Sequence, residues 1–270
     1  MSTPIVVDAA RVAVVMPAYN ESDGIEEFLR EVDEELSEHV GELTIVVVDD
    51  CSTDGTIGVV REAASALHSR VVCERNDRNR GHGPTAMTAY RRGLAEDPDL
   101  VVHVDGDGQF DAHDMVRVVR HLAAGADAVV GVRQGRTDPW YRSVLTTSLR
   151  AYLRVASGTK ALDPNCPLRA YRVPTLELLL RSLPDDTMIP SVYLSVLEHR
   201  LDLDLVELPV RSRVRRGHSA MGTAWGRGRA AVPPKRLLEF VAAAARESIV
   251  TIPRLGRGSD GGTSGAPPLA

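Results

Sequence analysis

Two carboxylates and an amide lie close together in the middle of the chain. Asp105, Asp107 and Gln109 alternate with glycines directly after the apolar, β-branched stretch 100–104. Alternate residues of an extended chain point the same way, and two carboxylates aimed at one point repel each other unless a cation lies between them. Hard oxygen ligands suit Mg²⁺ or Mn²⁺. The pattern predicts a divalent-metal site, and the alternative is an ordinary turn, because Asp-Gly is a common turn dipeptide.

Polar residues also follow earlier apolar stretches. We expect buried strands at residues 12–16, 43–48, 71–73, 100–105 and 128–132, with amphipathic helices between them, the first at 21–38. Continuous apolar strands that alternate with helices indicate an α/β fold, with a Rossmann-like, mostly parallel sheet and helices on both faces. Ligands of such sheets bind beyond the carboxyl ends of the strands. Tyr19 and Glu21 follow the first strand and Asp50 the second, so we expect them at one edge with Asp105. Helix capping is the alternative for each acid taken singly.

The second half of the chain is less regular. Apolar spacing predicts helices at 143–157, 175–183, 189–199 and 237–251, and a strand at 205–210. Asp163–Pro167 is predicted to be a turn. From residue 254 onward the composition is rich in Gly, Ser and Pro, which indicates a disordered tail at 254–270.

Charge is distributed unevenly along the 270 residues. The formal net charge is −5, yet residues 211–236 carry eight Lys and Arg and no acid, which leaves −13 on the rest. A basic segment on an acidic body indicates an anionic ligand or an anionic surface. Cys51, Cys73 and Cys166 form no C-x-x-C pair. This argues against a disulfide framework or a zinc site and favours a reducing cytoplasm.

Other classes of protein fit the sequence less well. Residues 1–10 lack the basic start and long apolar core of a signal peptide. The chain has no apolar run of about 18 residues, as a membrane span would need. The turn Pro17–Asn20 after the first strand is not glycine-rich, which argues against a dinucleotide-dependent oxidoreductase. We expect no nucleic-acid partner, and the sequence does not indicate an oligomeric state.

Three motifs, Val14–Glu21, Val48–Gly55 and Asp105–Gln109, together resemble family 2 glycosyltransferases of the GT-A fold. The nearest subgroup is the polyprenyl-phosphate sugar transferases, which are similar to dolichol-phosphate mannosyltransferase, and the resemblance extends from Val12 to Ser219. It implies a hexosyltransferase that inverts the anomeric carbon of a UDP- or GDP-linked sugar and needs Mg²⁺ or Mn²⁺.

The resemblance also implies roles for individual residues. Nucleotide binding falls to Pro17, Tyr19, Glu21, Asp50, His82 and Asp105. Metal binding falls to Asp105, Asp107 and Gln109. Contacts to acceptor or phosphate fall to Arg169, Arg213, Arg215, Arg216 and Ser219. The candidate catalytic residues are Asp107, Asp163, Arg215 and Arg216. For His82, a solvated loop histidine is the alternative.

Two segments depart from the subgroup, and both concern the acceptor. Cys166–Leu168 replaces Ser-Gly-Phe in the D-x-x-S-G-F-R segment, and Val214 and Ala220 replace basic residues of the R-x-x-G-x-S-K element. The acceptor therefore stays open. A lipid phosphate is already an anionic nucleophile, whereas a soluble hydroxyl needs a base, for which Asp163, Asp185 and Asp186 are candidates. A sugar-nucleotide-binding module without catalysis is the remote alternative.

The expected organisation follows from these roles. One GT-A domain spans residues 1–236, with a nucleotide-binding part at about 12–132 and an acceptor part at about 133–236. A C-terminal helix at 237–253 is too short to span a bilayer. It is expected to pack on the domain or rest on a membrane surface, which makes the chain cytoplasmic with an option of peripheral contact at the inner membrane face.

Overall fold

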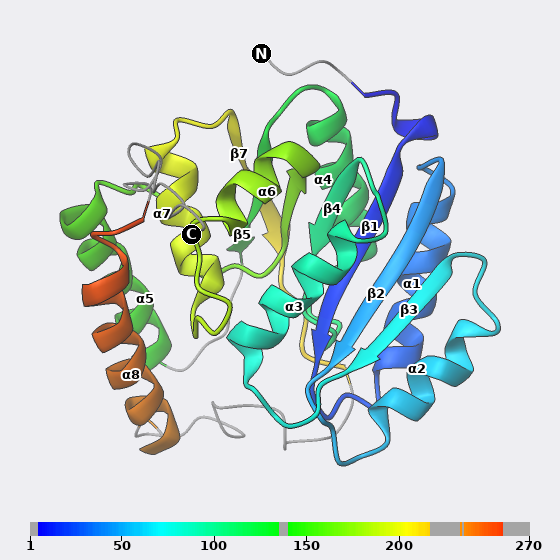
Figure 1. Cartoon of the computed structure of the whole chain (residues 1–270), viewed down its shortest axis with the longest axis horizontal. Coiled ribbons are helices and arrows are strands. Elements are labelled where there is room, and N and C mark those ends of the chain that lie inside the picture. The colour runs from blue at the N-terminus through cyan, green and yellow to red at the C-terminus, as the bar shows by residue number, and fades with distance from the viewer. Residues whose placement is uncertain (1–4, 135–139, 217–232, 234, 256–270) are drawn as a thin grey trace, which may run out of the picture.

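The computed structural model describes residues 5–134, 140–216, 233 and 235–255. Its sheet consists of β1 (Arg11–Ala18), β2 (Glu42–Asp49), β3 (Arg70–Arg75), β4 (Leu100–His103), β5 (Ala128–Gln134), β6 (Arg169–Arg172) and β7 (Leu205–Arg211). Its helices are the short η1 (Val7–Ala9), α1 (Ile25–Ser37), α2 (Thr56–Ala64), α3 (His82–Leu94), α4 (Ala112–Ala123), α5 (Trp140–Ser157), α6 (Val173–Leu180), α7 (Pro190–Arg200) and α8 (Lys235–Thr251) (Figure 1).

The strands follow the order β3-β2-β1-β4-β6-β5-β7. Neighbouring strands are parallel except at β6, which is antiparallel to both β4 and β5. The predicted α/β class with a mostly parallel sheet is confirmed. The sequence did not predict β6, because its four residues, two of them arginines, are too few and too polar to give a strand pattern.

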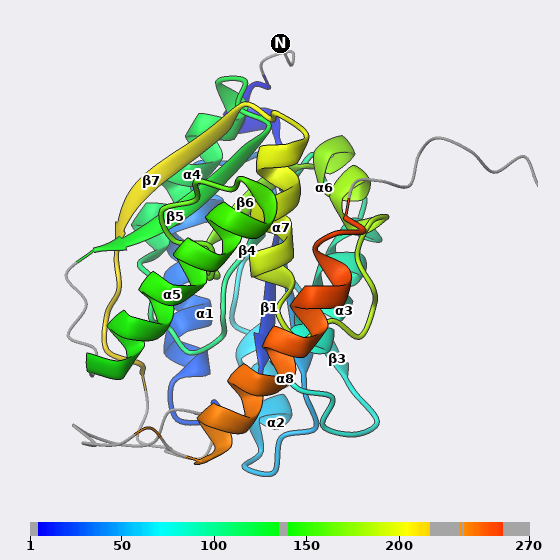
Figure 2. The same cartoon turned by 90° about the vertical axis from the view of Figure 1, so that its left-hand side faces the viewer.

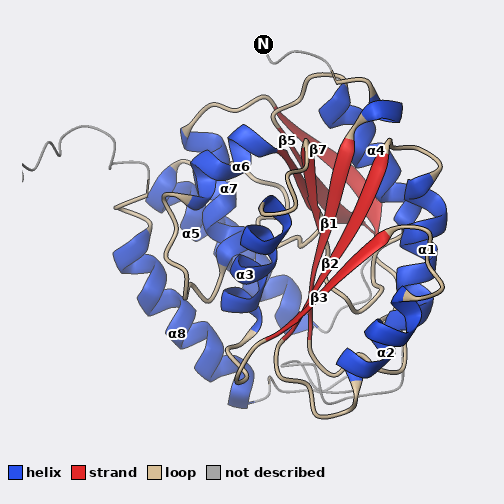
Figure 3. Cartoon of the chain, turned by 45° about the vertical axis from the view of Figure 1, so that its right-hand side comes forward, coloured by secondary structure: helices blue, strands red, loops and turns tan. Residues whose placement is uncertain are grey.

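Helices cover both faces of the sheet, as predicted (Figure 3). One apolar cluster joins the sheet to α1 and α4, and Phe28 and Met115 belong to it. The other joins the opposite face to α3, α6 and α7 and includes Tyr193. Val14 belongs to the first cluster and Val15 to the second, since alternate residues of a strand point to opposite faces. The central strands are therefore buried on both sides.

Several element boundaries differ from the prediction by a few residues. Pro17 is predicted to end the first strand, but β1 continues to Ala18, and the Pro17 carbonyl accepts a hydrogen bond from the Gly106 N–H (3.1 Å). Proline lacks only the N–H, so it still serves as an acceptor here. The helix expected from residue 21 begins at Ile25, after a turn. At the other end Leu255 is buried, so a disordered tail could start only at 256, outside the described residues.

Helices α5 and α8 lie outside α7 (Figure 2). They are joined to each other by a hydrogen bond from Ser248 Oγ to the Tyr152 hydroxyl (3.3 Å). Glu247 of α8 accepts a hydrogen bond from Thr187 Oγ1 (2.6 Å). Both helices begin at the end of the molecule where the parallel strands end (Figures 1 and 2). Of the helices in the described residues, none combines the length and apolar character that a bilayer crossing requires.

Candidate active site

The turns after β1 and β2 are joined by hydrogen bonds at the carboxyl edge of the sheet. The Asn20 N–H donates to Ser52 Oγ, and the Thr53 N–H donates back to Asn20 Oδ1, both at 2.9 Å. Asn20 has φ of 55°, a left-handed conformation that asparagine tolerates better than most residues. The Glu21 N–H donates to Thr56 Oγ1 (2.9 Å). Ser52, Thr53 and Thr56 were not among the residues predicted for the site, although they lie within or directly after the second motif.

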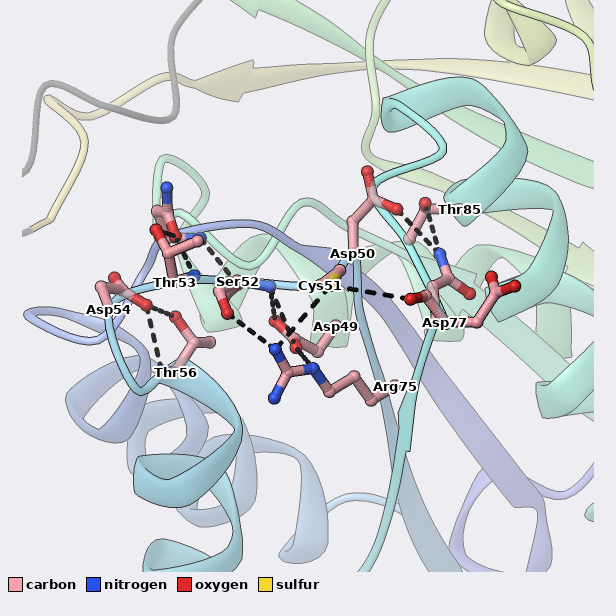
Figure 4. A network of polar contacts seen from close by, with 12 residues as sticks. Asp49, Asp50, Cys51, Ser52, Thr53, Asp54, Thr56, Arg75, Asp77 and Thr85 are labelled. Atoms are coloured by element: carbon pink, nitrogen blue, oxygen red, sulfur yellow. Dashed lines mark hydrogen bonds and ion pairs between the residues drawn. The ribbon is translucent and has the colours of Figure 1, made fainter.

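The consecutive aspartates at the end of β2 point in different directions and have different partners (Figure 4). Asp49 is fully buried, 3.3 Å from the Arg75 guanidinium. Asp50 accepts hydrogen bonds from the Asn76 side chain and from both backbone N–H groups of residues 80–81, each at 2.8 Å. Asp50 therefore fixes the loop before α3. A contact to a nucleotide base, as the sequence predicts, would use the lone pairs that these bonds leave.

The loop that Asp50 fixes brings His82 to the end of β4. His82 Nε2 lies 2.8 Å from Asp105 Oδ1. The charge of Asp105 raises the pKa of His82, against the opposing effect of burial. Burial would raise the pKa of Asp105, but His82 outweighs it and lowers that pKa. The pair is therefore favoured in its ionic form, while the His82 side chain stays 54% exposed at the surface of the loop.

Asp107 has a different environment from Asp105. Burial and the neighbouring charge of Asp105 raise the pKa of Asp107 to about 6, although Oδ1 accepts a hydrogen bond from the Gln109 N–H (3.1 Å). A hard divalent cation would remove this repulsion, so the donor set fits Mg²⁺ or Mn²⁺. No group of three His, Cys, Asp or Glu residues in the described ranges could hold a metal. An ion here would need further oxygens, as Mg²⁺ takes from substrate phosphates.

The basic segment after β7 lies along this acidic stretch. Residues 211–216, here called the arginine strip, run beside Asp107–Phe110. The Arg213 N–H donates to the Gln109 carbonyl (2.7 Å), and the Arg216 N–H donates to the Asp107 carbonyl (3.0 Å). The strip is therefore attached to the candidate metal site by its backbone.

Three of the four arginine side chains of the strip are paired with acids. The pairs join Arg213 to Glu31 and Asp111, Arg215 to Glu21, and Arg216 to Glu27 and Glu31. Burial raises the pKa of Glu21 to about 7, although the hydrogen bond from Arg215 lowers it. Arg213, Arg215 and Arg216 are thus neutralised by acids of the protein, whereas Arg211, Lys235 and Arg236 of the basic segment are exposed outside this cluster.

Asp163, a candidate base, faces Arg133 at the end of β5. Its buried carboxylate accepts hydrogen bonds from Arg133 Nε (2.7 Å) and Nη2 (2.8 Å). A carboxylate held in this way is poorly placed to take a proton from an acceptor hydroxyl, so the catalytic role of Asp163 stays a prediction that this ion pair does not favour. Arg133 is a residue that the sequence analysis missed, and its charge contributes to the lowered pKa of Asp105. Asp185 is exposed and pairs with Arg91.

Arg169, which the resemblance assigns to the acceptor or a phosphate, has its partners inside the protein. Its side chain is fully buried and donates to Glu198 Oε1 (2.9 Å), Ser195 Oγ (2.8 Å) and the Pro164 carbonyl (2.9 Å). All of these partners belong to the protein interior, so Arg169 supports the turn at 163–167, and its contact to an acceptor stays a prediction. Its sequence neighbours gave no sign of the partner, because Glu198 lies on a later helix.

The remaining predicted residues divide as follows. Pro17 is buried within β1, so its ring is not presented to a nucleotide, while Tyr19 is partly exposed beyond the end of that strand. Ser219 lies outside the described residues. Glu21, Asp50, His82, Asp105, Asp107 and Gln109 gather at the carboxyl edge of the sheet, with Arg213, Arg215 and Arg216 beside them. Paired carboxylates beside cationic side chains could hold a metal ion and a diphosphate together.

Comparison with known proteins gives consistent relatives. The chain is 31% identical over 212 residues to undecaprenyl-phosphate 4-deoxy-4-formamido-L-arabinose transferase of Edwardsiella ictaluri, covering 78% of this chain and 63% of the relative. The transferase of the same name from Klebsiella pneumoniae subsp. pneumoniae is 30% identical over 200 residues, covering 74% and 59%. The chain thus spans about three fifths of the length of these relatives.

A solved structure and a family model complete the comparison. Glucosyl-3-phosphoglycerate synthase from Mycobacterium tuberculosis, in complex with phosphoglyceric acid, has a TM-score of 0.59 and 25% identity, covering 93% of this chain and 82% of that chain. The sheet and its helices accordingly have the GT-A arrangement. Residues 13–180, more than half of the chain, match the model of glycosyl transferase family 2. The chain belongs to glycosyl transferase family 2.

Proposed function

We propose that this chain is an inverting, metal-dependent glycosyltransferase that moves a sugar from a UDP- or GDP-linked donor to a polyprenyl phosphate. The observation that carries the proposal is the meeting of Asp105 and Asp107 with His82 and the arginine strip at one edge of the sheet. Acids for a cation and cations for a diphosphate then share one site. Family membership and the names of the curated relatives, which include undecaprenyl phosphate, support the same reaction.

The donor would be held by residues from several strand ends. Asp105, Asp107 and Gln109 would hold Mg²⁺ or Mn²⁺, which as a Lewis acid stabilises the charge on the leaving diphosphate. His82 and Arg215 add positive charge, which has more effect in a site closed to water. Tyr19, Glu21 and Asp50 would border the nucleotide.

The reaction would displace the nucleoside diphosphate from the anomeric carbon. The acceptor oxygen attacks, the bond to the diphosphate oxygen breaks, and the configuration inverts. A lipid phosphate oxygen is already negative and needs no general base. The engagement of Asp163 with Arg133 favours this acceptor, because the most deeply placed base candidate is already occupied.

The second candidate is a soluble acceptor hydroxyl. The similarity to a solved synthase in complex with phosphoglyceric acid favours it, as does Val214, which stands where the subgroup has an arginine. This reaction would need a base, with Asp185 and Asp186 as the exposed candidates.

Peripheral membrane contact at the inner face of a cytoplasmic membrane belongs to the proposal. The start of α8 carries exposed Lys235 and Arg236 followed by exposed Leu238 and Phe240. Basic and apolar residues at the start of one helix suit an anionic bilayer surface, and this end of α8 lies where the strands end (Figure 1). A lipid acceptor would arrive from that side.

The decisive experiment combines a panel of UDP- and GDP-sugars with Mn²⁺ or a chelator. Each donor is offered a short-chain polyprenyl phosphate or a soluble alcohol, and sugar transfer is measured. We expect metal-dependent transfer to the lipid phosphate. Transfer to the alcohol alone would establish the second candidate, and donor binding without transfer to any acceptor would indicate a non-catalytic binding module.

A further inference from the structure

The structure separates two arginines that look equivalent in the sequence. Arg215 and Arg216 are neighbours in the strip, and both are only about 15% exposed. Arg215 turns toward the end of β1, where its Nε lies 3.1 Å from Glu21 Oε2. Arg216 turns the other way, onto α1, with Nη1 3.0 Å from Glu27 Oε1. Adjacent cations therefore face different parts of the molecule.

The space for Arg216 is created by two glycines. A Cβ at Gly24 would lie 2.6 Å from Arg216 Cβ and 3.0 Å from its backbone carbon. A Cβ at Gly108 would lie 2.6 Å from Arg216 Cδ. The Arg216 guanidinium carbon lies 5.9 Å from the centre of the Phe28 ring, within the range of a cation–π contact. The Arg216 side chain is therefore closely packed between these residues, and any side chain at Gly24 would push the strip away.

Glu31 links Arg216 to Arg213 and to the start of α4. Its Oε1 accepts hydrogen bonds from the Ala112 N–H at the start of α4 and from Arg213 Nη1, both at 3.0 Å. Its Oε2 pairs with Arg216. One carboxylate of α1 thus holds two arginines of the strip and the first turn of the helix that follows the candidate metal site.

We propose that Arg216, seated by Gly24, Gly108 and Glu31, anchors the arginine strip and so positions Arg215, the arginine that meets the donor. Arg216 and Glu31 are positioning residues in this assignment. The role of Arg215 toward the donor rests on the proposed function, whereas the anchoring is a property of the fold alone. The two parts can therefore be tested separately.

Hydrogen–deuterium exchange of the full chain tests the anchor without substrate. In Arg216→Ala, Gly24→Ala and Glu31→Ala, residues 211–216 should exchange roughly tenfold faster or more, the ratio expected on losing one hydrogen bond to a charged group. The strip then separates from the Asp107 and Gln109 carbonyls. In Glu31→Gln the side chain can still accept the hydrogen bond from the Ala112 N–H, but it lacks the charge that holds the arginines. This variant provides the test if Glu31→Ala does not fold.

Matched controls distinguish anchoring from general loosening. Gly58→Ala introduces the same methyl group where nothing lies within 4 Å, and Glu34→Ala removes an exposed acid of α1. Both should exchange like the wild type in residues 211–216, and so should Arg215→Ala. Unchanged exchange in Gly24→Ala and Glu31→Gln, or faster exchange in Arg215→Ala, would overturn the anchor.

Kinetics test the second part. Arg215→Ala should lower kcat while exchange stays normal. Gly24→Ala, at a residue that has no substrate contact in this assignment, should reproduce the loss of kcat/KM in Arg216→Ala, and combining the two changes should add nothing. Additive losses would show that Arg216 contacts substrate itself and would overturn the assignment. If the wild type transfers no sugar from any donor, the proposed function fails, yet the exchange result still decides the anchor.

Discussion

Asp105 and Asp107 are two residues apart, yet their surroundings give them different properties. Asp105 is stabilised as an anion by His82, whereas burial next to that anion raises the pKa of Asp107 to about 6. Asp107 therefore has the greater need of an added cation. This contrast depends on His82, which reaches Asp105 only because Asp50 fixes the intervening loop.

The first prediction concerns Asp107→Ala. We expect it to abolish sugar transfer and the Mn²⁺ dependence of donor binding while the fold stays intact, because it removes the proposed metal ligand and relieves repulsion with Asp105. Transfer assays and the donor-induced shift in Tm with and without Mn²⁺ measure this. Asp105→Asn should be nearly as damaging, and near-normal metal-dependent turnover by Asp107→Ala would contradict the assignment.

Residue types and spacing were enough to predict which acids gather at the site. Glu21, Asp50, Asp105 and Asp107 follow buried strands, and strand ends meet at one edge. Partners distant in the sequence were not predictable. The sequence around Asp163 does not indicate its ion pair with Arg133, and the sequence around Arg169 does not indicate its ion pair with Glu198. A local sequence pattern does not encode which buried charges will meet.

At the scale of elements, long periodic segments were predicted well and short polar ones poorly. The helices at α6 and α7 agree within a few residues, because their apolar faces must meet the sheet. β6 escaped prediction because a strand of four residues depends on its neighbours β4 and β5 for its hydrogen bonds. Its antiparallel insertion brings Arg169 beneath the turn at 163–167.

The second prediction follows from that burial. Arg169→Ala leaves Glu198 as an uncompensated buried charge, which should destabilise the fold by about 3–5 kcal/mol. Urea unfolding measures this, and the double variant with Glu198→Ala should cost less than the sum of the single changes. If Arg169→Ala unfolds like the wild type but raises the KM of the acceptor, Arg169 belongs to the acceptor site after all.

The third prediction concerns the junction of α1 with β3. Asp33 accepts hydrogen bonds from the N–H groups of His68 and Ser69, both at 2.9 Å. Burial would raise the pKa of Asp33, but these partners outweigh it and lower the pKa. A lowered pKa means that the stabilisation is complete above the unfolded value of about 4 and is lost as the pH falls through the folded value.

Asp33→Asn should therefore be less stable than the wild type at neutral pH, and the difference should shrink below about pH 4. Urea unfolding across a pH series measures it. Glu34→Gln, the same change of charge at an exposed position of α1, serves as the control. A gap between wild type and Asp33→Asn that stays constant into acid would show that shape, and not charge, holds this junction.

At the scale of the whole molecule, the uneven charge seen in the sequence becomes a contact between distant segments. The arginine strip lies against acids of α1 and the start of α4, although about 180 residues separate Glu31 from Arg213. The sequence predicted an anionic ligand or an anionic surface for the basic segment, and in its described part Arg213, Arg215 and Arg216 form an ion-pair cluster with acids of the protein. Arg211, Lys235 and Arg236 are exposed outside that cluster.

The last prediction concerns that exposed end of α8. Leu238 and Phe240 are 52% and 36% exposed beside Lys235 and Arg236. Each apolar side chain buried in a bilayer interface contributes roughly 1.5–3 kcal/mol. Because about half of Leu238 and a third of Phe240 are exposed and free to be buried, Leu238→Asp with Phe240→Asp should weaken co-sedimentation with anionic vesicles by roughly tenfold or more. It should also raise the KM for a polyprenyl phosphate in vesicles, while transfer to a water-soluble short-chain analogue stays normal.

The control is Leu201→Asp, at an exposed leucine just before β7 begins. It should change neither vesicle binding nor the KM for the polyprenyl phosphate. Unaltered vesicle binding by the double variant would mean that α8 does not rest on the membrane, and an equal loss with the soluble analogue would place its effect in the fold.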